Sequence, residues 1–376
     1  MSDDINKIRV CHISSVHGQE DVRIFHKECV SLAKAGYDVY EVTRGRTYDK
    51  NGVHIIGVSG ERLSRIERIL KTTREIYKKA VEIDADIYHA HDPELLPVCD
   101  RLKKQGKTVI FDSHENVVGT IKEKEYIPSA LRMVCSYIYE RYQKTICSKL
   151  DAIVTASPNV SDYFRSIGCQ CVIDLCNFPI LKNYKSPNYA SRKIVFAGNF
   201  GAQWNHDKIL DAIEGVEGVR YILCGAPQET TLRMLMIKDG WAKVDYRGKV
   251  PFEEVPSILA ESAVGLAILS AGQNTDGTKG NMANTKIFEE MMAGLPVVCT
   301  NFERWAEFVK EFDCGFCVDP NNIDEIRDAI KKLIDSPRLC ENKGKNGRRA
   351  VEERFNWGIE EVKLKELYAK LRIRLQ

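Results

Sequence analysis

A lysine, two glutamates, a glycine and a proline follow one another in the stretch NTKIFEEMMAGLPVV at residues 284–298. Asn284 or Thr285 can cap a short helix, and Gly294 is a typical residue just beyond a helix end. Lys286 then falls in the first turn, where the positive end of the helix dipole disfavours a cation. A lysine at that place is expected where the helix entrance faces an anion such as a diphosphate. The pattern predicts an anion site, the alternative being a capped helix with solvated charges.

Three histidines in the first half of the chain stand at the ends of apolar runs. His89 and His91 close the run Ile87–Ala90, and His114 directly follows Thr108–Asp112. Residues two apart share one face of a strand, so alternation does not separate His89 from His91. His91 is favoured for binding because it is nearer the carboxyl end. A histidine after a strand either contacts a ligand or closes a turn, and the residues alone leave both open.

Short apolar runs alternate with amphipathic helical stretches along the whole chain. The strands expected in the first half are Ile8–Ser14, Val39–Thr43, Ile87–Ala90, Thr108–Asp112, Ala152–Thr155 and Cys171–Cys176. Those expected in the second half are Lys193–Ala197, Val219–Cys224, Lys243–Tyr246, Val264–Leu269, Pro296–Thr300 and Gly315–Val318. The helices between them include Val22–Ala35, Glu94–Lys104 and Ala130–Cys147. Such alternation predicts an α/β fold with two doubly wound, Rossmann-like parallel sheets.

The boundary between the two series is expected in the polar segment Asn177–Arg192, which contains Pro179 and Pro187. The expected parts of the chain are a domain at 1–178, a linker at 179–191, a domain at 192–355 and a helix at 356–376. Ligands of open α/β sheets bind beyond the carboxyl ends of the strands. We therefore expect the site in a cleft between the two domains.

The composition excludes several classes of protein. Lys+Arg 55 against Asp+Glu 53 leaves a net charge of +2, which gives no footprint for bulk nucleic-acid binding and leaves a local basic face open. No apolar run approaches the ~20 residues that span a bilayer. The acidic start, Met1-Ser2-Asp3-Asp4, lacks the features of a secretory signal. The thirteen cysteines are expected to be reduced thiols, so we expect a cytoplasmic protein.

The stretch at 284–298 resembles the K-x-F-E-x-M-x-A-G-x-P-V-V signature of GT-B glycosyltransferases of family 4, which are retaining enzymes. Further segments resemble bacterial surface-polysaccharide members of that family: HISSVH at 12–17, DVRIFHKE at 21–28, YHAHDPELLP at 88–97 and FDSHE at 111–115. The sequence Phe355-Asn356-Trp357 resembles the family's turn into a closing helix that crosses back to the N-domain. The resemblance runs from residue 8 to about 370. It implies the GT-B architecture.

The resemblance also implies an activity. A hexosyltransferase of this type moves a sugar from a nucleotide-diphosphate-sugar donor, bound by the C-terminal domain, to a saccharide acceptor bound by the N-terminal domain. The acceptor is expected to be lipid-linked and the pathway to be cell-surface polysaccharide biosynthesis. In this family the leaving phosphate takes the acceptor proton on the same face. Neither a protein base, nor a divalent metal, nor another cofactor is therefore expected.

Carried over residue by residue, the resemblance implies that Glu289 binds the donor ribose. Asn284, Thr285 and Lys286 at the helix entrance face the diphosphate, and His114 contacts the transferred sugar. The expected catalytic residues are His114 and Lys286. Further donor contacts are expected from Gly198, Asn199, Gly201 and Asn281. Acceptor or cleft contacts are expected from Asp21, Arg23, His91 and Asp92.

Two positions depart from the family's pattern. Many members carry an arginine and a lysine after the first C-domain strand, where this chain has Asn199 and no lysine before Lys208. Asn281 stands in place of the first carboxylate of an E-x7-E pair that ends at Glu289. Compensation at the diphosphate is expected from Lys286, Lys279, Arg247 or the backbone amides of 198–201.

The stretch Glu61–Lys79 is rich in lysine and arginine with apolar residues between them. It predicts either a helix that lies on an anionic membrane, at the inner face of the cell membrane, or a solvated helix packed on the first sheet.

The sequence alone does not exclude two other classes of function. A sugar-nucleotide 2-epimerase has the same architecture but needs acid and base carboxylates near the sugar, and Glu115 is the one obvious candidate in the first half. A non-catalytic nucleotide-sugar binding protein is the second alternative, which Asn199 and Asn281 favour.

Overall fold

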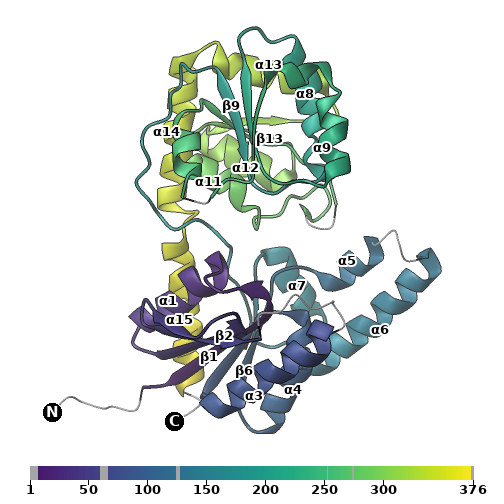
Figure 1. The fold of residues 1–376 in the computed structure, drawn as a ribbon, viewed down its shortest axis with the longest axis vertical. Helices are drawn as coiled ribbons and strands as arrows, with labels where there is room; N and C mark the ends of the chain where they lie inside the picture. Colours follow the sequence, from purple (N-terminus) through teal and green to yellow (C-terminus); the bar gives the residue numbers. More distant parts are fainter. Residues whose placement is uncertain (1–6, 60–66, 124–127, 252, 273–274, 374–376) are drawn as a thin grey trace, which may run out of the picture. The chain divides into compact units, whose positions relative to one another are not determined.

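The structure is a computed structural model, which describes residues 7–59, 67–123, 128–251, 253–272 and 275–373. The chain forms two compact units, each with its own sheet (Figure 1). Unit 1 contains the residues up to Asn177 together with those from Trp357 onward, and unit 2 contains Phe178–Asn356. Each unit is an α/β fold on a parallel sheet, so the predicted fold class is confirmed.

Unit 1 is built on an eight-stranded sheet of order β3-β4-β2-β1-β5-β6-β7-β8. Its strands are β1 (Arg9–Gly18), β2 (Asp38–Arg44), β3 (Tyr48–Lys50), β4 (Val53–Val58), β5 (Ile87–Ala90), β6 (Thr108–Ser113), β7 (Ala152–Thr155) and β8 (Val172–Asp174). Every pairing is parallel except that of β3 with β4. The strand order reverses at the β1–β5 pair. Because ligands of such sheets bind where the order reverses, the residues that end these two strands are the first to consider.

The helices of unit 1 cover both faces of this sheet. They are η1 (Val22–Cys29, π-helical), α1 (Val30–Lys34), η2 (Arg68–Thr72), α3 (Thr73–Ile83), η3 (Pro93–Leu95), α4 (Leu96–Lys104), α5 (Val117–Glu123), α6 (Ser129–Cys147), α7 (Pro158–Ser166) and α15 (Trp357–Ile373). One core contains Val109 and Phe111, and a second contains Ile110, because successive strand residues point to opposite faces.

The C-terminal helix α15 belongs to unit 1. Leu364, Leu367 and Leu371 are buried in the same core as Ile24 and Phe25 of η1. The predicted closing helix on the N-terminal domain is therefore confirmed.

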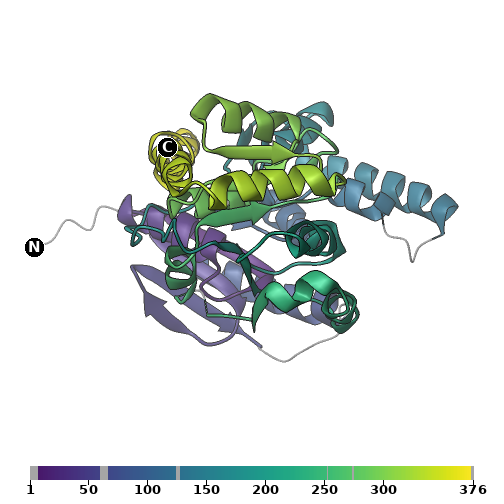
Figure 2. The ribbon, with the colours of Figure 1, turned by 90° about the horizontal axis from the view of Figure 1, so that it is seen from above.

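Unit 2 is built on a six-stranded, wholly parallel sheet of order β11-β10-β9-β12-β13-β14. Its strands are β9 (Lys193–Ala197), β10 (Arg220–Cys224), β11 (Val244–Gly248), β12 (Val264–Ala267), β13 (Val297–Thr300) and β14 (Gly315–Val318). Its helices are η4 (Ala202–Trp204), α8 (His206–Glu214), α9 (Glu229–Met236), η5 (Asp239–Lys243), α10 (Val255–Ala260), α11 (Thr285–Met292), α12 (Glu303–Phe312), α13 (Ile323–Ile334) and α14 (Pro337–Glu353). Helices flank the strands on both sides (Figures 1 and 2). The order reverses between β9 and β12, which makes the segments after these strands the place for a ligand.

Three details differ from the sequence expectations. The hairpin of β3 and β4 was not predicted, although its turn is Asn51-Gly52 with positive φ at both residues (51° and 79°), a strong hairpin signal. Residues 179–191, expected as a linker, pack on unit 2 through Asn188 N to Ala260 O (2.9 Å). The predicted helix Val22–Ala35 begins as a π-helix.

We predict that Leu364→Ala lowers the free energy of unfolding of unit 1 by about 2–5 kcal/mol, because the side chain is fully buried and its loss leaves a cavity. Val362→Ala on the same helix is the control, since Val362 is 54% exposed. Urea unfolding followed by hydrogen exchange in peptides of unit 1 measures both. Equal effects of the two substitutions would contradict the docking of α15.

Candidate active site

Asp92 joins the end of β5 to the end of β1. Its Oδ2 accepts hydrogen bonds from Ser15 N (2.6 Å), Val16 N (3.0 Å) and Ser14 Oγ (2.8 Å), and its Oδ1 lies 3.0 Å from His17 Nδ1. Burial raises the pKa of Asp92, but the hydrogen bond and charge of His17 outweigh it and hold that pKa well below the ordinary value. Burial lowers the pKa of His17, whereas Asp92 raises it, and the net shift is upward. Asp92 and His17 thus form an ion pair.

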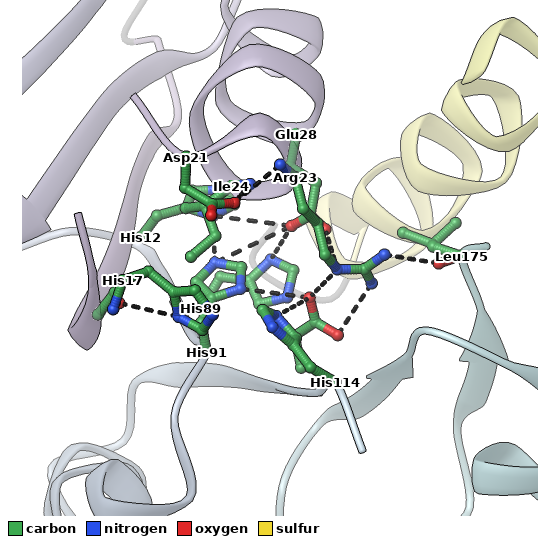
Figure 3. A network of polar contacts seen from close by, with 12 residues as sticks. His12, His17, Asp21, Arg23, Ile24, Glu28, His89, His91, His114 and Leu175 are labelled. Carbon is green, nitrogen blue, oxygen red and sulfur yellow. Dashed lines mark hydrogen bonds and ion pairs between the residues drawn. The ribbon is translucent and has the colours of Figure 1, made fainter. Parts of the chain in front are cut away.

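Asp112 is the centre of a second network at the end of β6, and its partners Arg23, His91 and His114 are labelled in Figure 3. Arg23 donates to both oxygens, from Nε to Oδ2 (2.9 Å) and from Nη2 to Oδ1 (3.0 Å), and its Nη1 donates to Leu175 O (2.7 Å). His91 Nδ1 and His114 Nε2 each lie 3.2 Å from Oδ2. Burial raises the pKa of Asp112, but the charge of Arg23 and then that of His114 hold it well below the ordinary value. An ionised Asp112 therefore fixes three cationic or imidazole partners.

His114 is the half-buried outermost member of the Asp112 network, with 22% of its side chain exposed. Because an ionised carboxylate only accepts hydrogen bonds, the Nε2 that faces Asp112 carries the proton. Nδ1 is then the imidazole nitrogen left for a ligand. The His17 ring lies beside it, with 4.8 Å between the ring centroids. Two carboxylate-oriented imidazoles side by side can bind hydroxyl groups and respond to charge in a substrate.

The four predicted acceptor residues have different surroundings. Arg23, His91 and Asp92 are buried, and their polar atoms bind other groups of unit 1. In this structure they position His17 and His114 rather than present themselves to an acceptor. Asp21 caps η1, since its Oδ1 accepts from Arg23 N (2.8 Å) and Ile24 N (3.1 Å). Contact between Asp21 and an acceptor stays a prediction.

The predicted donor residues meet in unit 2 at the start of α11. Asn284 Oδ1 accepts from Lys286 N (3.3 Å) and caps the helix, as expected, with Thr285 as its first residue. The Lys286 side chain crosses Gly198, where an added Cβ would lie 2.2 Å from Lys286 Cε and would displace the end of the lysine. Its ammonium lies 5.2 Å from the centre of the Trp204 ring. Burial lowers the pKa of Lys286, against the charges of Glu289 and Glu290, which raise it.

The segment after β9 lies against this lysine. Gly198 has a φ of +155°, Asn199 is exposed and Gly201 is half-buried. Asn281 shapes the segment before α11, because its Oδ1 accepts from Ala283 N (2.8 Å). The structure therefore brings Gly198 and Lys286 together at the point where the strand order of unit 2 reverses.

The two glutamates of α11 have opposite surroundings. Glu289 is half-buried near Tyr184, where burial and then the charge of Glu289 raise the pKa of the tyrosine to about 12. Glu290 is 3% exposed and packs against Gly265, so it has no surface for a ligand. This difference agrees with the choice of Glu289 as the donor residue, which stays a prediction.

Arg247 and Lys279 were both expected to bind the diphosphate in place of the arginine that Asn199 replaces, but their surroundings differ. Arg247 pairs with Asp245 (Nη2 to Oδ2, 2.7 Å) and with Glu261, so its charge is already neutralised. Lys279 is exposed. Of these candidates, Lys286 is the one fixed at the helix entrance.

Two family models match the chain. The one described as Glycosyltransferase Family 4 matches residues 22–174, and the one described as Glycosyl transferases group 1 matches residues 181–350. An uncharacterized glycosyltransferase of Methanocaldococcus jannaschii is 22% identical over 174 residues, which are 42% of this chain and 42% of that protein. The chain spans about half the length of the curated relatives it matches.

Solved structures match over almost the whole chain. Sucrose-phosphate synthase from Thermosynechococcus elongatus superposes with a TM-score of 0.77 at 17% identity, covering 98% of this chain and 100% of that one. HepE of Anabaena, solved in complex with UDP and glucose, has a TM-score of 0.71 at 12% identity, with 96% and 100% covered. These likenesses show the fold.

We predict that Asp92→Asn lowers the pKa of His17, because the desolvation stays and the carboxylate that opposes it is gone. Since folding raises the pKa of His17, the pair stabilises unit 1 below the ordinary histidine value of about 6.5 and loses this contribution as the pH rises through the raised value. NMR titration of the imidazole signals measures the shift. Asp49→Asn, beside the exposed His54, is the control and leaves His17 unchanged. An unshifted His17 in Asp92→Asn would refute the ion pair.

Proposed function

Because the chain belongs to the GT-B glycosyltransferases of the family 4 type, we propose that it transfers a sugar from a nucleoside-diphosphate-sugar to a saccharide acceptor, with retention of the anomeric configuration. The observation that carries this proposal is Lys286, which stands half-buried at the entrance of α11 and against Gly198. HepE, which shares the fold, has been solved with UDP and glucose. An equivalent donor is the ligand we propose for unit 2.

The donor diphosphate is expected at the N-terminus of α11. The first amides of a helix have no partner within it and attract an anion. Lys286 adds a positive charge in a partly desolvated place, where a charge-assisted contact is stronger than in water. Together these groups can neutralise the charge that develops on the leaving group. The proposal therefore includes no divalent metal at the diphosphate.

The state of Asp92 and Asp112 favours a transfer in which neither carboxylate acts as a nucleophile. Retaining glycosidases place two carboxylates about 5–5.5 Å apart beside the reacting carbon. Here Asp92 and Asp112 are buried and occupied by His17 and Arg23, so neither is offered as a nucleophile. A transfer in which the leaving phosphate takes the acceptor proton needs no such residue. His114 is then left to bind the transferred sugar.

The epimerase alternative is not favoured. It needs acid and base carboxylates at the sugar, and both family models that match describe glycosyltransferases. We retain a lipid-linked saccharide as the proposed acceptor and surface-polysaccharide synthesis as the proposed role, on the resemblance of the segments around His12, Arg23 and His91.

We predict that Lys286→Ala weakens donor binding roughly tenfold to hundredfold, the value of one charge-assisted hydrogen bond. Glu289→Ala is expected to act similarly if it holds the ribose. Lys331→Ala is the control, because Lys331 is an exposed cation of unit 2 on α13 and is not expected at the diphosphate. Calorimetric titration with UDP- and GDP-sugars gives the affinities, and full affinity in both Lys286→Ala and Glu289→Ala would refute the donor site.

The reaction itself is tested by release of nucleoside diphosphate with and without a lipid-linked acceptor. Release that depends on the acceptor supports transfer. Interconversion of sugar nucleotides without release would support an epimerase, and binding with neither outcome would support a non-catalytic binding protein.

We further propose that unit 1 binds to the inner, anionic face of the cell membrane. Part of the basic stretch, residues 60–66, lies outside the described residues. In η2 and α3, Ile76 and Ala80 are buried in the core, so this helix packs on the sheet. Its outer side is basic, and α6, which extends from unit 1 in Figure 1, has an exposed apolar row. The exposed residues are Lys71, Arg74, Lys78 and Lys79 on η2 and α3, and Leu131, Met133, Val134, Tyr137 and Ile138 on α6. No helix in the described part of the chain is long and apolar enough to cross a bilayer.

Reversing Lys71, Arg74 and Lys78 to glutamate is expected to weaken binding to phosphatidylglycerol vesicles more than about tenfold, since each basic residue near an anionic surface contributes about 1 kcal/mol. Reversal of the exposed Lys331 and Lys332 on α13 is the control. Vesicle flotation measures both variants. Absence of binding by the native chain, or equal binding by the two variants, would end the membrane proposal.

A further inference from the structure

Three histidines and a glutamate converge beneath the His17–His114 pair. His12 on β1 is paired in register with His89 on β5, and His91 follows two residues later on the same face. Glu28 reaches them from η1 (Figure 3). All four side chains are at most 1% exposed. A site of this kind is closed to solvent.

The distances join the four side chains around one point. Glu28 Oε2 lies 4.0 Å from His12 Nδ1, 3.8 Å from His89 Nδ1 and 3.9 Å from His91 Nε2. His12 Nδ1 and His91 Nε2 are 2.9 Å apart. One donor atom from each of the four residues lies within 4.8 Å of the others. Donor atoms that surround one tetrahedral ion at 2.0–2.2 Å are roughly 3.4 Å apart, close to these values.

The carboxyl group of Glu28 lacks the partners that a buried polar group needs. Neither of its oxygens has a hydrogen-bond partner among the described residues. Arg23 Nε lies 3.2 Å from Glu28 Oε1, but this guanidinium is already bound to both oxygens of Asp112. A buried carboxylate that shares its one guanidinium with a second carboxylate is unfavourable unless another cation or a proton completes its neutralisation.

We propose that His12, Glu28, His89 and His91 bind one divalent metal ion of the zinc class. Neutral imidazole nitrogens with a carboxylate oxygen are a donor set that Zn²⁺ prefers. The ligand atoms are His12 Nδ1, His89 Nδ1, His91 Nε2 and Glu28 Oε2. Four protein ligands leave no open position, so the ion is structural and takes no part at the donor diphosphate.

The groups behind the ligands fit this assignment. His91 donates from Nδ1 to Asp112 Oδ2 (3.2 Å), which leaves Nε2 deprotonated toward the ion, the carboxylate–histidine–metal arrangement of many metal sites. Tyr368 of α15 lies 3.4 Å from His12 Nε2 and 3.0 Å from His89 Nδ1. With a metal bound, the Tyr368 hydroxyl would still contact His12 Nε2, whereas His89 Nδ1 would bind the ion instead of the hydroxyl.

The π-helical conformation of η1 is consistent with this arrangement of Arg23 and Glu28. A π-helix hydrogen-bonds residues five apart, and Arg23 and Glu28 are five apart and in contact. One face of η1 thus delivers the cation to Asp112 and the carboxylate to the histidines. The metal would tie η1 to β1 and β5 below the half-buried imidazoles.

The experiment uses the full chain made in minimal medium with Zn²⁺ or Co²⁺ as the only added transition metal. We expect about one ion per chain after dialysis against chelator, and a visible spectrum of tetrahedral Co²⁺ without the intense near-ultraviolet bands of thiolate ligands. The thiolate bands matter because Cys299 and Cys317 lie 3.7 Å apart and offer a competing site. A native chain without stoichiometric metal, or one with thiolate bands alone, would overturn the proposal.

Two variants test the ligands. Glu28→Gln and His89→Gln are expected to lower the metal content at least tenfold, a loss that removal of even a supporting group can produce. His54→Gln is the control, because His54 is partly exposed in unit 1 and remote from the cluster in its contacts. Circular dichroism reports whether each variant is folded. Folded variants that keep the ion overturn the proposal, and if neither variant folds, the Co²⁺ spectrum of the native chain decides alone.

Discussion

The buried pair of Asp112 and Arg23 is the interaction on which the polar interior of unit 1 depends. Two opposite charges taken out of water are tolerated only when their geometry is good and their remaining hydrogen bonds are made. Both conditions hold, since the guanidinium meets both carboxylate oxygens and its third donor meets Leu175 O. The charge that stays on Asp112 then orients His91 on one side and His114 on the other. A neutral acceptor in its place would hold both imidazoles by weaker hydrogen bonds.

In unit 2 the charged side chain of Lys286 is positioned by aromatic rings rather than by a carboxylate. Within the described part of the chain, no carboxylate binds Lys286 as Asp112 binds Arg23. Its ammonium lies over the Trp204 and Phe196 rings, and its side chain crosses Gly198. Aromatic faces attract a cation without neutralising it. The positive charge is therefore kept in place and remains available to an anion at the entrance of α11. This separates Lys286 from Arg247, whose charge is consumed by two acidic neighbours.

Much of this arrangement follows from local sequence patterns, and the rest depends on contacts between distant segments. The strands, the capped helix at Asn284 and the closing helix are visible because apolar periodicity and capping are local properties. The burial of Arg23 could not be seen, since its partner Asp112 is 89 residues away. The register that places His12 beside His89 is likewise a property of strand pairing between separate segments. Glu28 was hidden further by the π-helical winding, which periodicity at 3.6 residues does not detect.

The candidate ligand-binding groups differ between the two units: they are imidazoles in unit 1 and a lysine at a helix entrance in unit 2. In unit 1, Asp92 and Asp112 are buried and hold imidazoles, and the partly exposed His17 and His114 are suited to orient hydroxyl groups. The helix entrance in unit 2 supplies positive potential and no general base. In the proposed reaction the leaving group itself accepts the acceptor's proton, so that the residues of both units have only to bind and position. The same reasoning explains how Asn199 and Asn281 can be accommodated. In the proposed donor site, positive potential from α11 and Lys286 would act on the whole diphosphate, whereas an arginine–lysine clamp acts on single oxygens.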